Sequence, residues 1–155
     1  MLQINDSAPL NIQVTDQNGQ AISLKQLLGK KILLYFYPKD NTPGCTVEAC
    51  NFRDANQQIA KHDIQIIGVS KDSVTSHQKF RDQHQLNFPL WSDPEHQLIE
   101  AFGAWGEKKM MGKTYFGTIR STFLINEKGK IIKTWPKVKA KDHSQEVLDF
   151  IEQKH

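Results

Sequence analysis

The chain has 155 residues and a formal net charge of +3, from 20 lysines and arginines against 17 acidic residues. Its 38% hydrophobic and 24% charged residues are typical of a globular protein and exclude a disordered or fibrous chain. The length favours a single domain over residues 1–155. The basic residues are dispersed, which indicates a solvated surface rather than a nucleic-acid binder.

No stretch is apolar over the roughly 18 residues that a membrane span needs, and the longest apolar run is Ile32–Tyr37. The first residues lack the basic start and apolar core of a signal peptide. We therefore expect a cytoplasmic protein without membrane contact. In a reducing compartment a close pair of cysteines, here Cys45 and Cys50, is more often catalytic or redox-active than structural.

The first half of the chain predicts a hairpin and two buried strands. Segments 12–15 and 21–23 flank Asn18-Gly19, a pair that favours a tight turn between antiparallel strands. Residues 31–37 are apolar from Ile32 onward, which is typical of a strand buried on both faces, and a turn-rich loop follows. A second strand is predicted over 65–70.

Helices are predicted after both of these strands. From Cys45 the apolar residues fall at helical spacing over about four turns, at Val47, Phe52, Ala55 and Ile59. Asp72 or Ser73 then caps a helix that runs to about Gln85. The second half predicts strand 88–91, a helix from Pro94 to Gly103, hairpin strands 118–125 and 130–135, and a helix that starts at Asp142 or Ser144.

This order of elements predicts an α/β protein. Crossover helices imply parallel strands, the second hairpin adds an antiparallel edge, and helices cover both faces. The expected architecture is a thioredoxin-like fold, in which a central mixed sheet is flanked by helices and carries an N-terminal β-hairpin.

Residues 38–50 carry the chemistry that the sequence predicts. A buried strand ends there, a loop follows, and Cys45 lies in the first turn of the next helix. The free N–H groups and the positive end of that helix favour a thiolate. Thr42 has a hydroxyl within reach of the same point, and Pro43 shields the sulfur from water. We expect a reactive thiolate at Cys45 rather than a buried structural cysteine.

Cys50 follows Cys45 by five residues, and this spacing bears on disulfide formation. In an intact α-helix the two Cα atoms are roughly 8–9 Å apart, beyond the roughly 7 Å limit for a disulfide. The sulfurs can therefore bond only if the first turns of the helix unwind. A metal site is disfavoured, because no histidine or third cysteine stands at ligand spacing beside the pair.

Arg120 interrupts a predicted strand that is otherwise apolar or hydroxylated. Two interpretations are equally open. Arg120 is either a surface residue at the strand end, or it faces the thiolate, keeps it ionised and orients an oxygen substrate. Glu48, one turn after Cys45, either fixes Arg120 or favours the helix N-terminus.

At these residues the sequence resembles the peroxiredoxins, and among them the bacterioferritin-comigratory-protein or peroxiredoxin Q subgroup. The family motif Pro-x-x-x-Thr/Ser-x-x-Cys is matched by Pro38, Thr42 and Cys45, and Cys50 fills a resolving position that not all subgroup members have. The loop 108–113 stays uninterpreted. Other matching segments extend the resemblance over essentially the whole chain: 36–46, 48–50, 52–54, 88–93, 103–108 and 120–125.

The resemblance implies a thiol-dependent peroxidase that reduces hydrogen peroxide and organic hydroperoxides to water and alcohols. Cys45 is then the peroxidatic cysteine, oxidised to a sulfenic acid, and Cys50 resolves it as an intramolecular disulfide. The implied reductant is thioredoxin, or alternatively glutaredoxin; no metal or other cofactor is implied, and a monomer suffices. The other implied site residues are the catalytic Thr42 and Arg120 and the substrate-positioning Pro38, Pro43, Gly44 and Glu48.

Two other protein classes share the predicted fold. A general thiol–disulfide oxidoreductase is disfavoured, because it would use Cys-x-x-Cys within one helical turn. A copper-binding module would need a histidine to complete its site, and we interpret the six histidines as surface residues. Four aromatic residues either line the approach to the site or belong to the core, which is favoured: Phe88, Trp91, Trp105 and Phe116.

Overall fold

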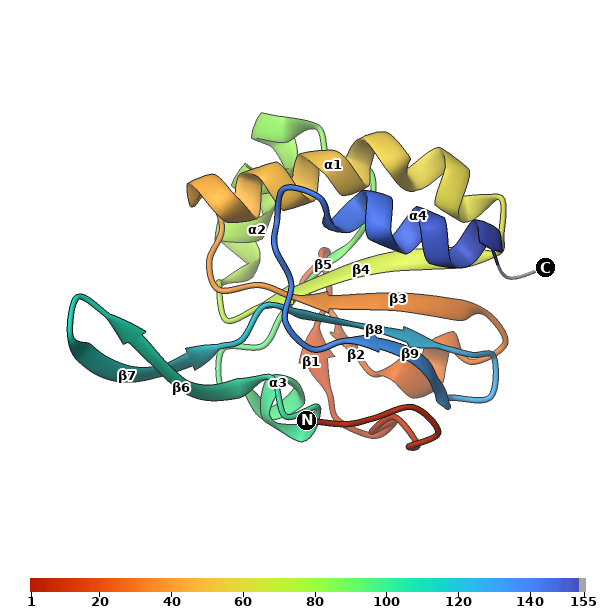
Figure 1. The fold of residues 1–155 in the computed structure, drawn as a ribbon, viewed down its shortest axis with the longest axis horizontal. Helices are drawn as coiled ribbons and strands as arrows, with labels where there is room; N and C mark the ends of the chain where they lie inside the picture. Colours follow the sequence, from red (N-terminus) through yellow and green to blue (C-terminus); the bar gives the residue numbers. More distant parts are fainter. Residues whose placement is uncertain (154–155) are drawn as a thin grey trace.

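The structure, a computed structural model, describes residues 1–153. These residues form a seven-stranded mixed sheet with helices on both faces, beside a separate two-stranded hairpin (Figure 1). The strand order in the sheet is β2-β1-β5-β4-β3-β8-β9. The sheet strands are β1 (Val14–Thr15), β2 (Ala21–Ile22), β3 (Lys31–Phe36), β4 (Ile64–Ser70), β5 (Leu90–Ser92), β8 (Ser121–Ile125) and β9 (Ile131–Trp135). The separate hairpin comprises β6 (Trp105–Met110) and β7 (Lys113–Thr118), and the helices are η1 (Leu24–Leu27), α1 (Pro43–Ala60), α2 (Val74–His84), α3 (Gln97–Ala101) and α4 (His143–Gln153).

β3 lies inside the sheet because its apolar residues can be buried on both faces. It pairs with β4 in parallel, where Leu34 stands opposite Ile67. On its other side it pairs with β8 in antiparallel fashion, where Leu34 stands opposite Phe123. Because α1 connects β3 to the parallel β4, the loop between β3 and α1 lies at the carboxyl edge of the parallel strands, where α/β proteins place their sites.

Alternate residues of β3 point to opposite faces and join two apolar clusters. Leu33 and Tyr35 pack with residues of α1, α2 and α4, whereas Leu34 and Phe36 pack with α3 and the N-terminal region. Figure 1 shows α1 and α4 on one side of the sheet and α3 on the other. Across residues 1–153, no helix combines the length and apolar character that a membrane span requires.

Most predicted elements are confirmed, with boundaries shifted by a few residues. The N-terminal hairpin pairs Val14 with Ile22, and β1 continues the sheet by pairing with β5. α2 is capped by Ser73, whose hydroxyl accepts the N–H of Ser76 at 3.1 Å. The second hairpin, of β8 and β9, also forms as predicted.

Two predicted boundaries are wrong. α3 begins at Gln97 rather than Pro94, because the Asp93 carboxylate accepts the N–H groups of Gln97 and Ile99 at 3.0 and 2.9 Å. The predicted strand 118–125 is broken at residues 119–120, which separate β7 from β8. Arg120 therefore lies in a break between strands rather than within one.

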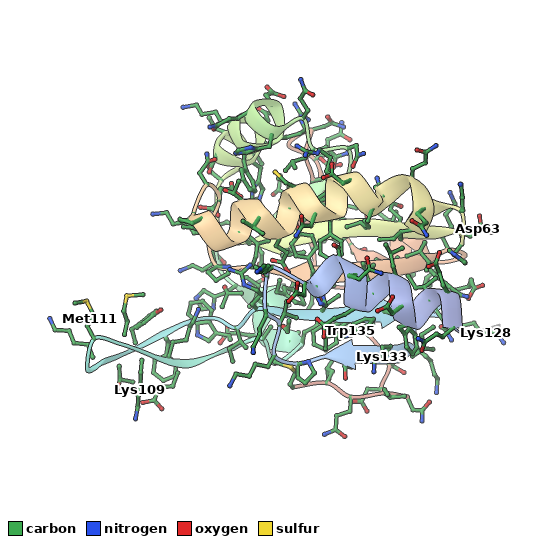
Figure 2. All side chains as sticks on the ribbon, turned by 45° about the horizontal axis from the view of Figure 1, so that its top comes forward. Asp63, Lys109, Met111, Lys128, Lys133 and Trp135 are labelled. Carbon is green, nitrogen blue, oxygen red and sulfur yellow. The ribbon has the colours of Figure 1, made fainter. Side chains whose placement is uncertain are left out.

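The sequence does not predict the hairpin of β6 and β7. Figure 1 shows it projecting away from the sheet, and Figure 2 labels Lys109 and Met111 near its outer end. Its two-residue turn, Met111-Gly112, has φ angles of 51° and 78°, as a mirror-image hairpin turn requires. The uninterpreted loop 108–113 is therefore the end of a hairpin.

The prediction that all six histidines lie at the surface is wrong for His77 and His143. Both are buried, because polar groups inside the protein meet both nitrogens of each ring. Of the others, His62 is exposed, His84 and His96 are half-buried, and His155 lies outside the described residues.

The four aromatic residues divide between the core and the surface. Phe88 and Trp91 are buried in the core, as favoured. Trp105 opens β6 and is half-buried, whereas Phe116 on β7 is 66% exposed. Phe116 is therefore not a core residue: it belongs to neither apolar cluster, although Trp105 at the base of the same hairpin packs against the second cluster.

Candidate active site

Cys45 lies in the first turn of α1, where the loop after β3 enters the helix. Thr42 is the N-cap residue and α1 begins at Pro43. The Cys45 side chain is buried, with 2% of its surface exposed. The first N–H groups of a helix have no partner within it, and the helix dipole adds positive charge there, so the sulfur lies where unpaired donors and partial positive charge meet.

Arg120 reaches the sulfur from the break between β7 and β8. Its Nη2 donates to Cys45 Sγ at 3.1 Å, and its Nη1 donates to Glu48 Oε1 at 2.5 Å. Burial opposes the charge of Arg120, but the facing Glu48 and Cys45 outweigh it and raise the Arg120 pKa. Of the two interpretations of Arg120, the structure supports the one in which its guanidinium faces the sulfur.

Glu48 lies one turn after Cys45 and is almost fully buried, with 1% exposed. Its Oε1 accepts from Arg120, whereas its Oε2 has no hydrogen-bond partner among the described residues. Burial raises the pKa of Glu48 to about 7, against the lowering effect of Arg120. The contact supports the interpretation that Glu48 fixes Arg120, and the pKa allows this carboxyl to change protonation near neutral pH.

Tyr35 is a further polar group beside these charges. Its buried hydroxyl has no hydrogen-bond partner among residues 1–153. Burial first, and then the negative charges of Glu48 and Cys45, raise the pKa of Tyr35 well above its usual value. Sequence reasoning missed Tyr35, because an aromatic residue in a buried strand is typical of the core.

Thr42 and Pro38 lie in the loop that leads into α1. The Thr42 hydroxyl donates to the Lys39 carbonyl at 3.0 Å and does not cap the helix. Within the described part of the chain no hydrogen bond joins Thr42 to Cys45. Pro38 is half-buried directly after β3. The structure thus brings both residues to the entrance of α1 while the Thr42 hydroxyl faces its own loop.

Pro43 and Gly44 form the first two positions of α1. Pro43 is exposed, at a position where a missing N–H costs a helix nothing. A Cβ at Gly44 would lie 3.4 Å from Arg120 Nη2, so a larger side chain there would crowd the guanidinium. Gly44 therefore leaves the space that Arg120 occupies beside Cys45.

Comparison with known proteins decides the family. Residues 4–134 match the AhpC/TSA family. The chain belongs to the AhpC/TSA family. Peroxiredoxin Bcp of Bacillus subtilis is 49% identical over 150 residues, which are 97% of this chain and 95% of that protein. Peroxiredoxin Bcp of Escherichia coli K12 is 41% identical over 152 residues, which are 98% of this chain and 97% of that protein.

Solved structures of AhpC/TSA proteins agree with this assignment. A structure of Xanthomonas campestris Peroxiredoxin Q has a TM-score of 0.89 and 36% identity, and the alignment covers 99% of this chain and 97% of that one. A second structure, with the same scores, is described as giving insight into the alkyl peroxide reduction activity of the Xanthomonas bacterioferritin comigratory protein. The thioredoxin-like fold and the peroxiredoxin Q resemblance are confirmed, and this AhpC/TSA protein is a thiol-dependent peroxidase.

Cys50, the second cysteine of this AhpC/TSA protein, lies farther along α1. It is half-buried, and both cysteines are free. Arg53 Nη1 lies 3.7 Å from Cys50 Sγ and also donates to the His84 carbonyl at the end of α2, at 2.7 Å. The structure therefore places Cys50 beside Arg53 and separates it from Cys45 along a continuous helix.

Lys108, on the β6–β7 hairpin, is a site residue that the sequence does not predict in this AhpC/TSA chain. Its Nζ donates to the Thr118 carbonyl at 2.9 Å. Burial, and then the charge of Arg120, lower the pKa of Lys108, while Cys45 opposes that shift. Only the hairpin register brings Lys108 within reach of these charges, and no sequence pattern marks that register.

Proposed function

We propose that the chain reduces hydrogen peroxide and organic hydroperoxides through a Cys45 sulfenic acid and a Cys45–Cys50 intramolecular disulfide. The observation that carries this proposal is the 3.1 Å contact between Arg120 Nη2 and Cys45 Sγ at the N-terminus of α1. It supports an ionised sulfur, which is the form that attacks a peroxide. The alkyl peroxide reduction named for the Xanthomonas relative supports organic hydroperoxides as substrates.

In the first step the Cys45 thiolate attacks one peroxide oxygen. A sulfur–oxygen bond forms as the O–O bond breaks, and the leaving oxygen takes the electron pair of that bond. It then accepts a proton and departs as water or an alcohol. Arg120 supplies a fixed donor for the negative charge that develops. The Thr42 hydroxyl supplies a second donor only after its O–H turns away from the Lys39 carbonyl, to which it donates in this structure.

The remaining predicted site residues position these groups. Glu48 holds Nη1 of Arg120, which directs Nη2 at the sulfur. Gly44 leaves room for the guanidinium, and Pro38 and Pro43 fix the backbone on either side of Thr42. Such fixed geometry holds the reacting atoms close together and lowers the entropic part of the barrier.

Resolution of the sulfenic acid requires a change in α1. Cys50 attacks the Cys45 sulfur, a disulfide forms, and the hydroxyl of the sulfenic acid leaves as water with the proton of the Cys50 thiol. Both cysteines lie in one continuous helix, in which residues five apart are too distant for a disulfide. The first turns of α1 therefore unwind before the second step.

An external dithiol completes the cycle by thiol–disulfide exchange and is itself oxidised to a disulfide. We assign this role to thioredoxin, with glutaredoxin as the alternative. Because both cysteines lie in one chain, the cycle needs no second subunit, which supports a monomer. Two free cysteines close together in the sequence are typical of a reducing compartment, which supports a location in the cytoplasm. The seven-stranded sheet with an apolar cluster on each face supports one catalytic domain over residues 1–155.

A single-turnover experiment tests this function. Reduced protein is mixed with substoichiometric hydrogen peroxide, and peroxide loss is followed together with intact mass. We expect consumption far faster than by a free thiol, and a product lighter by two hydrogens. Cys50→Ser is the matched control: its first oxidation stays fast, but the product is a sulfenic acid that dimedone traps.

Three results would contradict the proposal. Substantial peroxide turnover by Cys45→Ser would remove Cys45 from its role, and no trapped sulfenic acid in Cys50→Ser would remove Cys50 as resolver. Oxidation of the natural chain at the rate of a free thiol would favour a general thiol–disulfide oxidoreductase. Reduction of insulin by the chain would then be the confirming assay for that alternative.

A further inference from the structure

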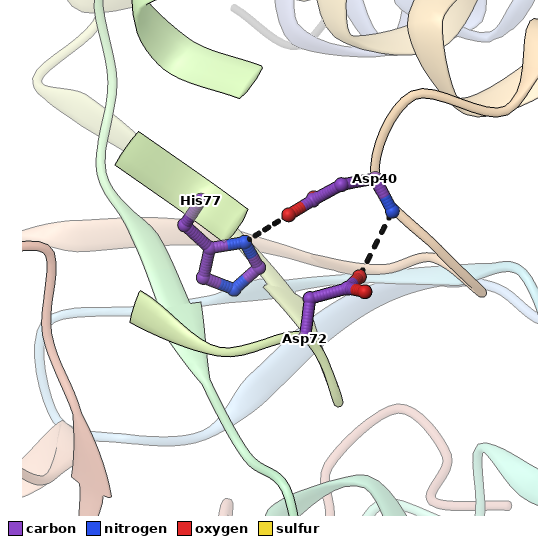
Figure 3. Close-up of side chains that lie close together, drawn as sticks. All are labelled: Asp40, Asp72 and His77. Atoms are coloured by element: carbon purple, nitrogen blue, oxygen red, sulfur yellow. Dashed lines mark hydrogen bonds and ion pairs between the residues drawn. The ribbon is translucent and has the colours of Figure 1, made fainter. Parts of the chain in front are cut away.

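Three polar side chains lie together behind the loop that leads into α1. Asp40 belongs to this loop, Asp72 follows β4, and His77 lies on α2 (Figure 3). One ring nitrogen of His77 and one carboxylate oxygen from each aspartate all lie within 4.8 Å of one another. The side chains of Asp40 and His77 are each 98% buried. Their hydrogen bonds show what this group does.

The ring of His77 faces a polar oxygen at each of its two nitrogens. Its Nε2 lies 3.0 Å from the Trp91 carbonyl oxygen, which can only accept, so Nε2 bears a proton. Its Nδ1 lies 2.7 Å from Asp40 Oδ2, another acceptor when the carboxyl is ionised. A neutral ring would point a lone pair at that oxygen, so a second proton lies between Nδ1 and Oδ2.

The Asp40 carboxylate has donors at both oxygens. Oδ1 accepts from the Tyr37 hydroxyl at 2.6 Å, and Oδ2 accepts from the Ser76 hydroxyl at 2.8 Å as well as from His77. The Tyr37 and Ser76 hydroxyls are donors independent of His77, and both stabilise the ionised carboxylate, which favours the shared proton on the ring. Because these bonds occupy both ring nitrogens and both carboxylate oxygens, the group is a closed ion pair rather than a vacant metal site.

This ion pair attaches the loop to the body of the protein. The Asp40 backbone N–H donates to Asp72 Oδ2 at 2.8 Å, and the Ser70 hydroxyl at the end of β4 donates to the same oxygen at 2.7 Å. The loop is therefore held through its backbone by Asp72, which follows β4, and through the Asp40 side chain by His77 of α2. The Trp91 carbonyl of β5 in turn holds the His77 ring.

The attachment lies close to the reacting sulfur along the chain. Asp40 precedes Thr42 by two residues, and the Thr42 carbonyl accepts the Thr46 N–H at 2.9 Å in the first turn of α1. The start of α1, and with it Cys45, is therefore placed by a loop that the ion pair fixes. A buried charge left without its partner is strongly unfavourable, so loss of either member would displace this loop.

We propose that Asp40 and a doubly protonated His77 form a buried ion pair that positions Thr42 and Cys45 for attack on the peroxide. Both are positioning residues, since neither touches Cys45. The inference rests on the proposed function, because positioning matters only if Cys45 is the residue that the peroxide oxidises.

The first test needs no variant. In a spectrum of protein with isotope-labelled histidine at pH 7, His77 is expected to show protons bonded to both ring nitrogens. A spectrum with a proton on one nitrogen only would overturn the ion pair. This readout stands even where a variant fails to fold.

The second test compares two reactions of Cys45 in Asp40→Asn and His77→Gln. We expect oxidation by hydrogen peroxide to slow by about 10- to 100-fold in each variant. Alkylation by iodoacetamide, which needs a reactive sulfur but no peroxide geometry, should stay equal or become faster. The double variant should lose no more than either single variant, because the two residues act as one unit.

Matched controls are Asp82→Asn and His62→Gln, which alter exposed residues of the same types. Both should oxidise at the natural rate. Natural-rate oxidation of folded Asp40→Asn would overturn the positioning role, as would an equal loss of oxidation and alkylation. Slow oxidation of the natural chain would instead contradict the proposed function, so the two failures are distinguishable.

Discussion

The guanidinium of Arg120 donates both to the Cys45 sulfur and to the Glu48 carboxylate, which holds the guanidinium in place. Nη2 points at Cys45 and Nη1 at Glu48, so one planar group meets two acceptors at fixed geometry. Arginine stays charged throughout the cycle, and its fork cannot be reproduced by a single ammonium. The site therefore depends on the shape of this side chain as well as on its charge.

Arg120→Lys tests that dependence. The variant keeps the charge but cannot hold Glu48 and face the sulfur with the same geometry, so we expect Cys45 oxidation to slow by about 100-fold or more. Stopped-flow measurement of peroxide consumption gives the rate constant, with Arg81→Lys on α2 as the matched control. A lysine variant that reacts at the natural rate would show that charge alone suffices.

Glu48 makes the free energy of unfolding depend on pH. Its pKa is about 7 in the folded protein against 4.5 ordinarily, so between these values the folded state binds more protons than the unfolded state. The contribution of Glu48 to the free energy of unfolding therefore falls as the pH rises from about 4.5 to about 7. Urea unfolding at several pH values should show this slope, and Glu48→Gln should lack it. The same slope in both proteins would assign it to another group.

At the residue scale, the sequence predicts the residues that react better than it predicts the buried residues that hold them in position. The helix start and the family motif suffice for Cys45, and Arg120 is noticed as a charge in an apolar segment. His77 is missed, although it stands three residues before the buried Phe80 and hence on the same helical face. A polar residue on a buried face is a usable signal only when its partners are known, and Asp40 is distant in sequence.

At the scale of elements, the beginning of α1 has one face exposed to solvent, at Pro43 and Val47, whereas the rest of the helix is fixed in the core. Val47, between the two cysteines, is 43% exposed, whereas Phe52 in the following turn is fully buried in the core. Arg53 also attaches this later part to α2 through the His84 carbonyl. Unwinding that begins at Pro43 should therefore stop before Phe52.

Val47→Ala and Val47→Gly test whether unwinding limits disulfide formation. Glycine disfavours a helix by about 1 kcal/mol relative to alanine, so disulfide formation should be about fivefold faster in the glycine variant. The first oxidation of Cys45 should be nearly the same in both. Quenched samples analysed by intact mass measure each step, with alanine and glycine at the exposed Gln57 as the matched pair. Equal resolution rates for the two Val47 variants would contradict unwinding as the limiting step.

Elements with strong local signals are predicted, and the β6–β7 hairpin is not. Asn18-Gly19 marks the N-terminal turn, whereas the Met111-Gly112 turn contains no such pair although both φ angles are positive. The hairpin also lacks an alternating apolar pattern, because most of its side chains meet solvent rather than the core. Its strands are recognisable only from their pairing with each other.

At the scale of the whole molecule, the two apolar clusters hold the sheet in place, whereas the start of α1, which should unwind during the reaction, is held less firmly. β3 contributes to both clusters, and β4 and β8 hold it on either side. The N-terminal turns of α1 contribute little to either cluster apart from Cys45 and Ala49. Oxidation should therefore alter one end of one helix and leave the sheet unchanged.

Hydrogen exchange measured by mass spectrometry tests this separation. After conversion to the disulfide form, amides of residues 46–51 should lose protection, because their helical hydrogen bonds open. Amides of β3 and β4 should keep theirs. Cys50→Ser treated with the same peroxide is the control, and it should keep its helix. Loss of protection that extends into β3 would contradict a local transition.

The order of helices and strands along the chain is almost sufficient to predict how the strands are arranged in the sheet. Two strand–helix–strand connections predict parallel neighbours, and a hairpin after them predicts an antiparallel edge, as β3, β4, β5, β8 and β9 show. The order of elements does not predict the group around His77, because the group depends on where two loops, a helix and a strand meet. Such contacts require the three-dimensional structure.

The position of both cysteines in one helix also has a consequence for redox potential. The proposed Cys45–Cys50 disulfide, which forms only by opening α1, would be destabilised by the helical hydrogen bonds and the Arg120 contact that it breaks. Each ~1.4 kcal/mol of that destabilisation makes the couple about 30 mV more oxidising. Reduction lets α1 refold, and the refolding adds to the driving force for electron transfer from the dithiol. The proposed cycle therefore predicts that a moderately reducing dithiol regenerates the enzyme.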